Sequence, residues 1–236
     1  MIKTQNLSKN YSGLRAVDDV SFTAEPGEVL GFLGPNGAGK TTTMRMIAGF
    51  IPPTSGSASI CGHDVATEPL AAKTALGYLP EGAPTYGEMT VRGFLDFIAD
   101  LRGLEGAHRR TRLDYVIGHL QLDGVLEQTV DTLSKGFKRR VGLAQAIVHD
   151  PKVLILDEPT DGLDPIQKHE VRTLIAEIAR EKTIVISTHI LEEVDAVCTR
   201  AIIIARGRLV ADGTPAELKM RAPSGRLEDV FRSIAA

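Results

Sequence analysis

A glycine-rich loop with one lysine and two threonines stands near the start of the sequence, and its residue types suit a chain of phosphates. The segment Gly34-Pro35-Asn36-Gly37-Ala38-Gly39-Lys40-Thr41 fits the pattern G-x-x-x-x-G-K-[ST], and Thr42 follows it. The glycines let several backbone N–H groups point inward. Lys40 supplies a cation for the β- and γ-phosphates, and the Thr41 hydroxyl is a ligand for Mg²⁺. A glycine-rich turn before an ordinary helix is the alternative interpretation.

Two adjacent carboxylates, Asp157 and Glu158, follow a short apolar run much later in the sequence. Asp157 is placed to hold Mg²⁺ through water, and Glu158 is placed to polarise an attacking water as a general base. A strand-ending Asp-Glu-Pro turn would explain Pro159, but it would not explain two acids beside a phosphate loop. We therefore expect both segments to form one site that binds and hydrolyses ATP.

Buried strands must position these segments. The apolar run 29–33 precedes the glycine-rich loop, and residues 40–50 carry apolar side chains at helical spacing before Pro52-Pro53 ends the pattern. The run 153–156 is wholly apolar, as in strands that are buried on both faces of a parallel sheet. Ligands of open α/β sheets bind at the carboxyl ends of strands. The loop and the two carboxylates are thus expected at one edge of one sheet.

A second candidate phosphate contact lies at Ser134, which opens a predicted helix with an anion-binding N-terminus. The segment Leu133-Ser134-Lys135-Gly136-Phe137, together with residues 140–147, resembles the signature sequence of the ATP-binding-cassette (ABC) proteins, and the resemblance runs from about residue 2 to residue 213. In that family the signature of one subunit caps the ATP held by the phosphate loop of the other. The resemblance therefore implies that Ser134, Lys135 and Gly136 contact the ATP of a partner subunit, in a homodimer or a paired cassette.

The same resemblance implies further roles. Tyr11 matches the aromatic residue that stacks on adenine, although a strand aromatic packed in the core is the alternative. Asp164 matches the loop that communicates between the paired sites, and His189 matches the switch histidine that contacts the γ-phosphate and orients the catalytic water. The other histidines are expected on the solvated surface.

The chain departs from the family pattern at two places. Glu81 stands where most members carry a glutamine, and because a carboxylate can still ligate Mg²⁺ we expect activity with an altered metal or pH dependence. In the signature, Lys135 and Phe137 replace the usual first glycine and the glutamine, whereas Ser134 and Gly136 are retained. Such variants are frequent among cassettes that serve ABC-2-type exporters, which favours export.

The expected fold is α/β, a P-loop NTPase core of mostly parallel sheet flanked by helices, with an N-terminal antiparallel β part and a helical insert. We expect an ATP-binding core at residues 1–83 and 150–213, a helical subdomain with the signature at 84–149 and a helical extension at 214–236. Strands are predicted near residues 2–7, 18–24, 28–33, 57–61, 75–79, 153–157, 183–187 and 201–205. Helices are predicted at 40–50, 90–101, 109–120 and 134–149, and residues 80–87 form a loop that is flexible by composition.

Composition limits the partners. The formal net charge of −3 and the sequence pI of about 6.1 give no pull toward nucleic acid. We expect the basic clusters at 109–112 and 135–140 to be solvated helix faces, and a partner contact at residues 138–140 is the alternative. Cys61 and Cys198 are expected as buried thiols rather than a disulfide.

No apolar run in the sequence reaches the ~20 residues that span a bilayer, and no signal peptide is visible at the start. The chain is therefore expected in the cytoplasm, peripheral on the inner face of the cell membrane through an integral membrane permease. Exposed apolar residues are expected after Glu81, at Tyr86, Met89 and Val91, where related cassettes dock their permease.

Three classes of function compete for this sequence. The leading hypothesis is the ATPase subunit of a transporter, driven by ATP-dependent dimerisation. A soluble ABC ATPase that acts on ribosomes or DNA is the alternative, but the segment between Thr41 and Ser134 leaves no room for the long coiled coil of repair-type members, and translation-type members generally join two cassettes. An unrelated P-loop GTPase or kinase would leave the signature unexplained, and no Asn-Lys-x-Asp motif is present.

Overall fold

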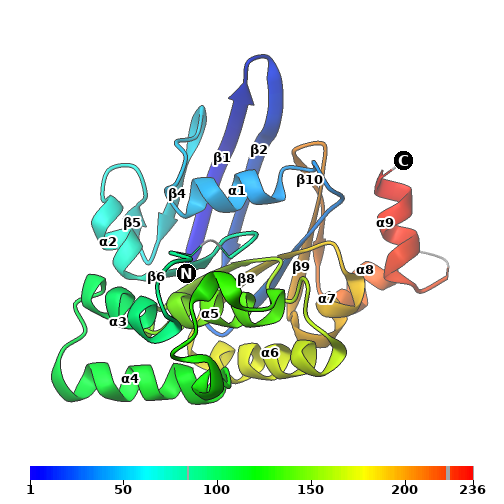
Figure 1. The fold of residues 1–236 in the computed structure, drawn as a ribbon. Helices are drawn as coiled ribbons and strands as arrows, with labels where there is room; N and C mark the ends of the chain where they lie inside the picture. Colours follow the sequence, from blue (N-terminus) through cyan, green and yellow to red (C-terminus); the bar gives the residue numbers. More distant parts are fainter. Residues whose placement is uncertain (84, 222–223, 236) are drawn as a thin grey trace.

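Two sheets form the frame of the protein. The computed structural model describes residues 1–83, 85–221 and 224–235. The first sheet is antiparallel, with the order β2-β1-β4-β5. Its strands are β1 (Ile2–Tyr11), β2 (Leu14–Ala24), β4 (Ser55–Ile60) and β5 (His63–Asp64). Figure 1 shows β1 and β2 as a long hairpin beside α1 (Lys40–Ile47).

The second sheet has six strands in the order β10-β9-β3-β8-β7-β6. Its strands are β3 (Val29–Leu33), β6 (Leu76–Leu79), β7 (Val153–Asp157), β8 (Thr183–Thr188), β9 (Arg200–Ala205) and β10 (Arg208–Gly213). All neighbours are parallel except β10, which pairs antiparallel with β9. Every residue of β3, β6, β7 and β8 is buried, as expected of parallel strands covered on both faces.

Helices cover both faces of this sheet. They are α1, α2 (Pro69–Thr74), α3 (Val91–Leu101), α4 (Gly106–His119), α5 (Lys135–Ile147), α6 (Pro165–Ile178), α7 (Leu191–Val197), α8 (Pro215–Lys219) and α9 (Leu227–Ala235), with 3₁₀ turns at Asp123–Val125, Val130–Thr132 and Ala179–Glu181. In Figure 1, α3 and α4 lie beside α5 on one side of the molecule, and α8 and α9 lie on the opposite side. None of the helices within the described ranges is long and apolar enough to cross a membrane.

The core follows the alternation of side chains along the central strands. Leu154, Leu156 and Ile184 pack with the helices α3, α5 and α6 on one face. Val153 and Ile155 pack on the other face with α1 and the antiparallel sheet. The strands β7 and β8 therefore lie between two large apolar clusters, and the edge of the sheet carries the loops that bear the candidate chemistry.

The predicted α/β core with an antiparallel N-terminal part is confirmed, while several boundaries differ. β2 starts at Leu14 rather than at 18, because β1 and β2 pair around a tight turn at Ser12 and Gly13. The first helix ends at Ile47 rather than at 50, since Gly49 adopts a left-handed conformation (φ +69°) that ends it. The helices α2, α6 and α7 were not predicted. The predicted flexible loop 80–87 includes residue 84, which lies outside the described residues.

Candidate functional site

The register of the parallel strands brings the predicted segments to one edge. Asp157 pairs with Ser187 at the end of β7 and β8, and Leu33 pairs with Thr188 at the end of β3. Leu79, two residues before Glu81, pairs with Leu156. The phosphate loop, Glu81, the acidic pair and His189 thus all leave the sheet at its carboxyl edge, where open α/β sheets bind ligands.

The phosphate loop closes on Lys40. Gly39 precedes α1 with φ +105°, and a Cβ there would lie 2.5 Å from the carbonyl oxygen of Ala16. Only glycine fits this position without strain. Lys40 is 6% exposed, and its ammonium donates hydrogen bonds to the carbonyl oxygens of Gly34 (2.7 Å) and Pro35 (3.3 Å). An ammonium has three donors, so Lys40 can hold both carbonyls and still donate to a phosphate oxygen.

A cavity of about 240 Å³ lies against this loop, between cationic and anionic side chains. Its lining includes Asn36, Gly37, Gly39, Lys40, Thr41 and Thr42 from the loop and α1, together with Ala16, Glu81 and Glu158. Burial lowers the pKa of Lys40, and the neighbouring carboxylates Glu158, Asp157 and Glu81 oppose that shift. The cavity therefore holds a cation for phosphate and carboxylates for a metal ion or a water molecule.

Asp157 is fully buried at the end of β7. Its Oδ1 accepts a hydrogen bond from the Ser187 hydroxyl, and its Oδ2 is buried without a hydrogen-bond partner among the described residues. A buried carboxylate oxygen of this kind is costly unless a charged or hydrogen-bonding group meets it. Thr41 and Glu81 line the neighbouring cavity, and the binding of Mg²⁺ by the oxygens of Thr41, Glu81 and Asp157 stays a prediction. Ser187, which sequence reasoning missed, is the polar residue at the end of an apolar strand.

Glu158 and His189 form a pair across the ends of β7 and β8. His189 Nδ1 lies 2.9 Å from Glu158 Oε1, and the side chains are 47% and 12% exposed. The backbone of Glu158 is left-handed (φ +53°), and its N–H donates to the carbonyl of Ser187 (3.0 Å). The turn thus directs a carboxylate from the sheet edge into the cavity, next to an imidazole that can orient it.

The predicted signature residues lie at helix starts rather than in this cavity. Ser134 caps α5, where its hydroxyl accepts from the N–H of Phe137 (3.3 Å), and Lys135 is exposed. Gly136 is buried, and a Cβ there would lie 2.5 Å from Oε1 of Gln167. Asp164 is exposed and caps α6 by accepting from the N–H of Gln167 (2.9 Å). Gln167 therefore connects the two helix starts, since its N–H donates to Asp164 and its side chain lies against Gly136. Ser134 and Asp164 are exposed to solvent, where a second molecule can reach them.

Tyr11 lies at the end of β1 and is 45% exposed, with the Lys9 ammonium 5.2 Å from the centre of its ring. The alternative of a core aromatic is therefore wrong. Tyr11 is not one of the residues that line the 240 Å³ cavity, and Ala16 of β2 is the lining residue from this hairpin. The adenine contact of Tyr11 stays a prediction.

The prediction that the basic cluster at 135–140 is a solvated face is wrong for two arginines. Arg139 is 5% exposed and donates to the carbonyls of Asp157 (3.4 Å) and Pro80 (3.5 Å), and burial lowers its pKa. Arg140 is 7% exposed and pairs with Glu170 (2.8 Å). The available signal was helical spacing, because Arg140 shares one face of α5 with Gly136 and Ala144.

The other basic cluster, at 109–112, is also tied to its neighbours. Arg109 pairs with Asp96 (2.8 Å), and Arg112 donates to the carbonyls of Val148 (2.9 Å) and Ile147 (2.8 Å) at the end of α5. These contacts hold α4 against α3 and α5. Cys61 and Cys198 are free thiols as predicted, but both are half-buried rather than buried, and burial raises the pKa of Cys198 to about 12.

A family model described as "ABC transporter" matches residues 17–161, more than half of the chain and including the phosphate loop, the signature and the acidic pair. The chain belongs to the ABC transporter family. The Nod factor export ATP-binding protein I of Burkholderia pseudomallei (strain K96243) is 40% identical over 215 residues, which cover 91% of this cassette and 71% of that protein. The "Probable multidrug ABC transporter ATP-binding protein YbhF" of Escherichia coli (strain K12) is 35% identical over 97% of this cassette, which spans only 40% of the length of that relative.

Solved structures resemble the cassette over nearly its whole length. A structure described as the ATP-binding subunit of an ABC transporter superposes with a TM-score of 0.92 at 30% identity and 99% coverage of both chains. The dimeric cassette MJ0796 superposes with a TM-score of 0.83 at 22% identity, covering 91% of this chain and 98% of that one, which shows a shared fold. The cassette is therefore of the ATP-binding subunit type.

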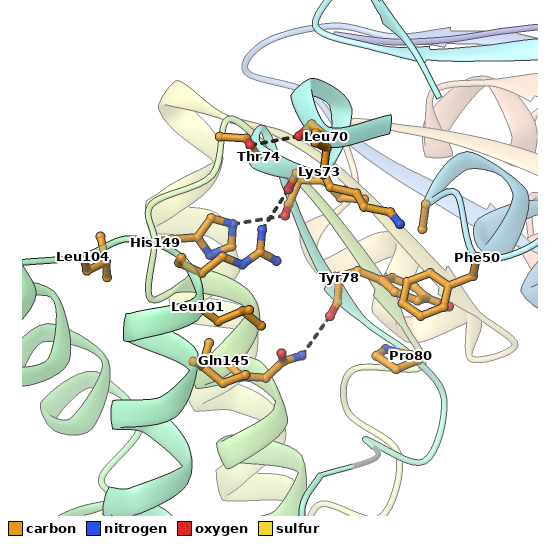
Figure 2. A pocket seen from close by; sticks show the side chains of 14 residues that line it. Phe50, Leu70, Lys73, Thr74, Tyr78, Pro80, Leu101, Leu104, Gln145 and His149 are labelled. Atoms are coloured by element: carbon orange, nitrogen blue, oxygen red, sulfur yellow. Dashed lines mark hydrogen bonds between the residues drawn. The ribbon is translucent and has the colours of Figure 1, made fainter. Parts of the chain in front are cut away.

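A second cavity of the cassette, about 640 Å³, is lined by residues of α2, α3 and α5 (Figure 2) and shares no lining residue with the 240 Å³ cavity. Phe50, Leu70 and Leu101 are 66%, 82% and 69% exposed at this groove, and Pro80, next to Glu81, also lines it. The prediction of exposed apolar residues after Glu81 holds for Tyr86 (61% exposed), is only partly right for half-buried Met89 and is wrong for Val91. Val91 begins α3 and packs into the core.

His149 lies at this groove and contradicts the prediction that every histidine but His189 is solvated. It is half-buried, and its Nε2 lies 3.0 Å from the carbonyl oxygen of Leu76 (Figure 2). Its Nδ1 is buried and has no hydrogen-bond partner in the described part of the chain. Burial lowers the pKa of His149 to about 4, helped by the positive charge of Arg102. The residue is therefore neutral at physiological pH.

Proposed function

We propose that the chain binds and hydrolyses ATP as the motor subunit of an ABC exporter, and that ATP-driven dimerisation moves a separate membrane permease. The observation that carries this proposal is the convergence of Lys40, Asp157 and the Glu158–His189 pair on one sheet edge. The names of the relatives, which are ATP-binding proteins for Nod factor export and multidrug transport, support export.

In this proposal the nucleotide-binding residues are Tyr11, Gly34, Asn36, Gly37, Gly39, Lys40, Thr41 and Thr42. Lys40 holds the β- and γ-phosphates, and inward N–H groups of the loop hold the remaining oxygens. Thr41, Glu81 and Asp157 hold Mg²⁺, and the buried Oδ2 of Asp157 supports this assignment because it lacks another partner among the described residues. The ion supplies charge neutralisation at the phosphate oxygens.

Glu158 acts as the general base and accepts a proton from the attacking water at its carboxylate. His189 orients that carboxylate through Nδ1, at the 2.9 Å distance described above, and contacts the γ-phosphate. Ser134, Lys135 and Gly136 bind the ATP of the partner subunit, and Asp164 communicates between the two sites. The exposure of Ser134 and Asp164 supports an arrangement in which each site is completed by a second cassette, in a homodimer.

The permease contacts the groove between α2, α3 and α5. Its rim is apolar at Phe50, Leu70 and Leu101, and the charged side chains that line it are the cations Lys73 and Arg102. We infer a permease segment with apolar residues and a carboxylate. The chain then works in the cytoplasm, peripheral on the inner face of the cell membrane, with residues 84–149 as a helical subdomain that links this groove to the signature.

Glu158→Gln tests the motor. The amide cannot take up a proton from water, so turnover should fall by about 10²–10⁴-fold. ATP affinity should be kept, and an ATP-bound dimer should accumulate in size-exclusion chromatography with light scattering. Glu88→Gln, an exposed carboxylate outside the cavity, is the matched control. Wild-type turnover in Glu158→Gln would remove Glu158 from the proposed role.

Purification of the tagged chain from detergent-solubilised native membranes, followed by mass spectrometry, tests the permease. A multi-span membrane protein at equal stoichiometry is expected. Leu101→Asp should release it, whereas Leu14→Asp, at a leucine 68% exposed on the β1–β2 hairpin, should not. Recovery with ribosomal or DNA-associated proteins only would contradict the transporter function.

A further inference from the structure

Glu193 is a buried carboxylate that does not line the 240 Å³ cavity. Glu193 belongs to the first turn of α7 and is 2% exposed. The hydroxyl of Thr160 donates to its Oε1, and the hydroxyl of Thr188 donates to its Oε2 (2.6 Å). A carboxylate is costly to bury unless such donors meet it. The two threonines, which are 2% and 0% exposed, therefore both donate their hydroxyl hydrogen bonds to the Glu193 carboxylate.

These threonines lie next to the two residues of the proposed catalytic pair, at the ends of β7 and β8. Thr160 follows Glu158 by two residues, and Thr188 directly precedes His189. The Thr188 hydroxyl also accepts from the N–H of Ile190 (3.0 Å), so it fixes the backbone on both sides of His189. The Glu158–His189 contact of 2.9 Å completes a closed ring of contacts. The ring runs from Glu158 along the chain to Thr160, through Glu193 to Thr188, and along the chain to His189.

Glu193 is enclosed by protein groups. It is not one of the residues that line the 240 Å³ cavity, and neither are Thr160 and Thr188. Burial raises the pKa of Glu193, and the Thr188 hydrogen bond and the positive charges of Arg172 and Lys168 oppose that shift. Its contacts join two loops and leave no face for a ligand.

We propose that Glu193 is a positioning residue, which holds the loops of Glu158 and His189 at the separation that ATP hydrolysis requires. The inference rests on the proposed roles of Glu158 and His189. It predicts that loss of Glu193 affects the hydrolytic step while ATP binding stays intact, because the phosphate loop makes none of the ring contacts. A displacement of about 1 Å at such a pair can cost about 10²-fold in rate.

Steady-state ATPase kinetics and titration with a fluorescent ATP analogue test the proposal in four variants. Glu193→Ala should lower kcat by about 10- to 100-fold and leave the analogue's Kd within about twofold. Glu193→Gln should retain most activity, since an amide can accept from one hydroxyl and donate to the other. Thr188→Val should reproduce the loss. Glu192→Ala, the exposed neighbour in the same turn, should behave as wild type.

A double-mutant cycle with His189→Ala separates positioning from general damage. If Glu193 acts through the pair, Glu193→Ala should add almost no further loss of kcat in the His189→Ala background. An additive loss, an unchanged kcat in Glu193→Ala, or a Kd that rises as much as kcat falls would each overturn the proposal. Where Glu193→Ala does not fold, Thr188→Val carries the same cycle, and Glu193→Gln serves as the variant that keeps activity.

Glu158→Gln, measured in parallel, distinguishes a failure of the proposed catalytic pair from a failure of the positioning role of Glu193. If Glu158→Gln loses turnover and Glu193→Ala does not, the proposed catalytic pair stands and the positioning role of Glu193 is wrong. If Glu158→Gln keeps wild-type turnover, the pair itself is wrong and the positioning role falls with it.

Discussion

Lowering the pH should destabilise the cassette through His149. The Nε2–H of this imidazole donates to the carbonyl of Leu76, and its Nδ1 is buried without an acceptor among the described residues. A proton on Nδ1 would therefore be buried unpaired, near the guanidinium groups of Arg102 and Arg112, with Asp150 as the opposing carboxylate. The unfolded chain takes up this proton near pH 6.5, whereas the folded chain resists it down to about pH 4.

The size of the effect follows from this difference in pKa. Since the folded pKa lies below the unfolded one, stability is present above pH 6.5 and is lost as the pH falls. Between pH 7.5 and pH 5 the difference corresponds to about 2 kcal/mol of unfolding free energy from this one group, at about 1.4 kcal/mol per pH unit. With a urea m-value of about 3 kcal/mol/M, the midpoint should fall by about 0.7 M through His149 alone.

Urea unfolding of the nucleotide-free protein at pH 7.5 and pH 5, in wild type and His149→Gln, measures the contribution of His149 to the unfolding free energy. Glutamine can keep the donor to the Leu76 carbonyl and does not titrate. The wild-type midpoint should therefore fall by about 0.7 M more than the variant midpoint. Equal shifts in the two proteins would refute the buried, unpaired Nδ1 as the cause.

Two further substitutions test the phosphate contacts. Lys40→Ala should weaken ATP binding by about 10- to 100-fold, because a charge-assisted contact is lost; isothermal titration beside the exposed-lysine control Lys152→Ala measures this, and equal affinities would contradict the phosphate-loop assignment. Gly136→Ala should lower turnover at least tenfold, of order 1.4 kcal/mol, since its Cβ would displace Gln167 between the two helix caps. Adding Gln167→Ala should restore part of the ATPase rate, and no recovery would argue against that clash.

Much of the fold could be predicted from local chemistry. Wholly apolar runs such as 153–156 can only be buried on both faces, so they indicated central parallel strands, and the glycines before Lys40 indicated a loop that no other residue type fits. Ser134 begins the predicted helix with a side chain that accepts from a backbone N–H group, which is a local property, whereas the helix that Asp164 caps was not predicted. The family resemblance then supplied candidate roles that spacing alone does not give.

Tertiary structure decided what each of these residues meets. The register of β7 against β8 pairs Asp157 with Ser187, and the sequence carries no mark of that pairing. A charged side chain has no intrinsic preference that distinguishes a solvated helix face from a packed one, so the burial of Arg139 and Glu193 follows only from what packs over them. The sequence by itself determined the phosphate loop and the strands that carry it, because both depend on neighbours in the chain. The ring that joins Glu158, His189 and Glu193 depends on contacts between distant segments, so only the folded chain decided it.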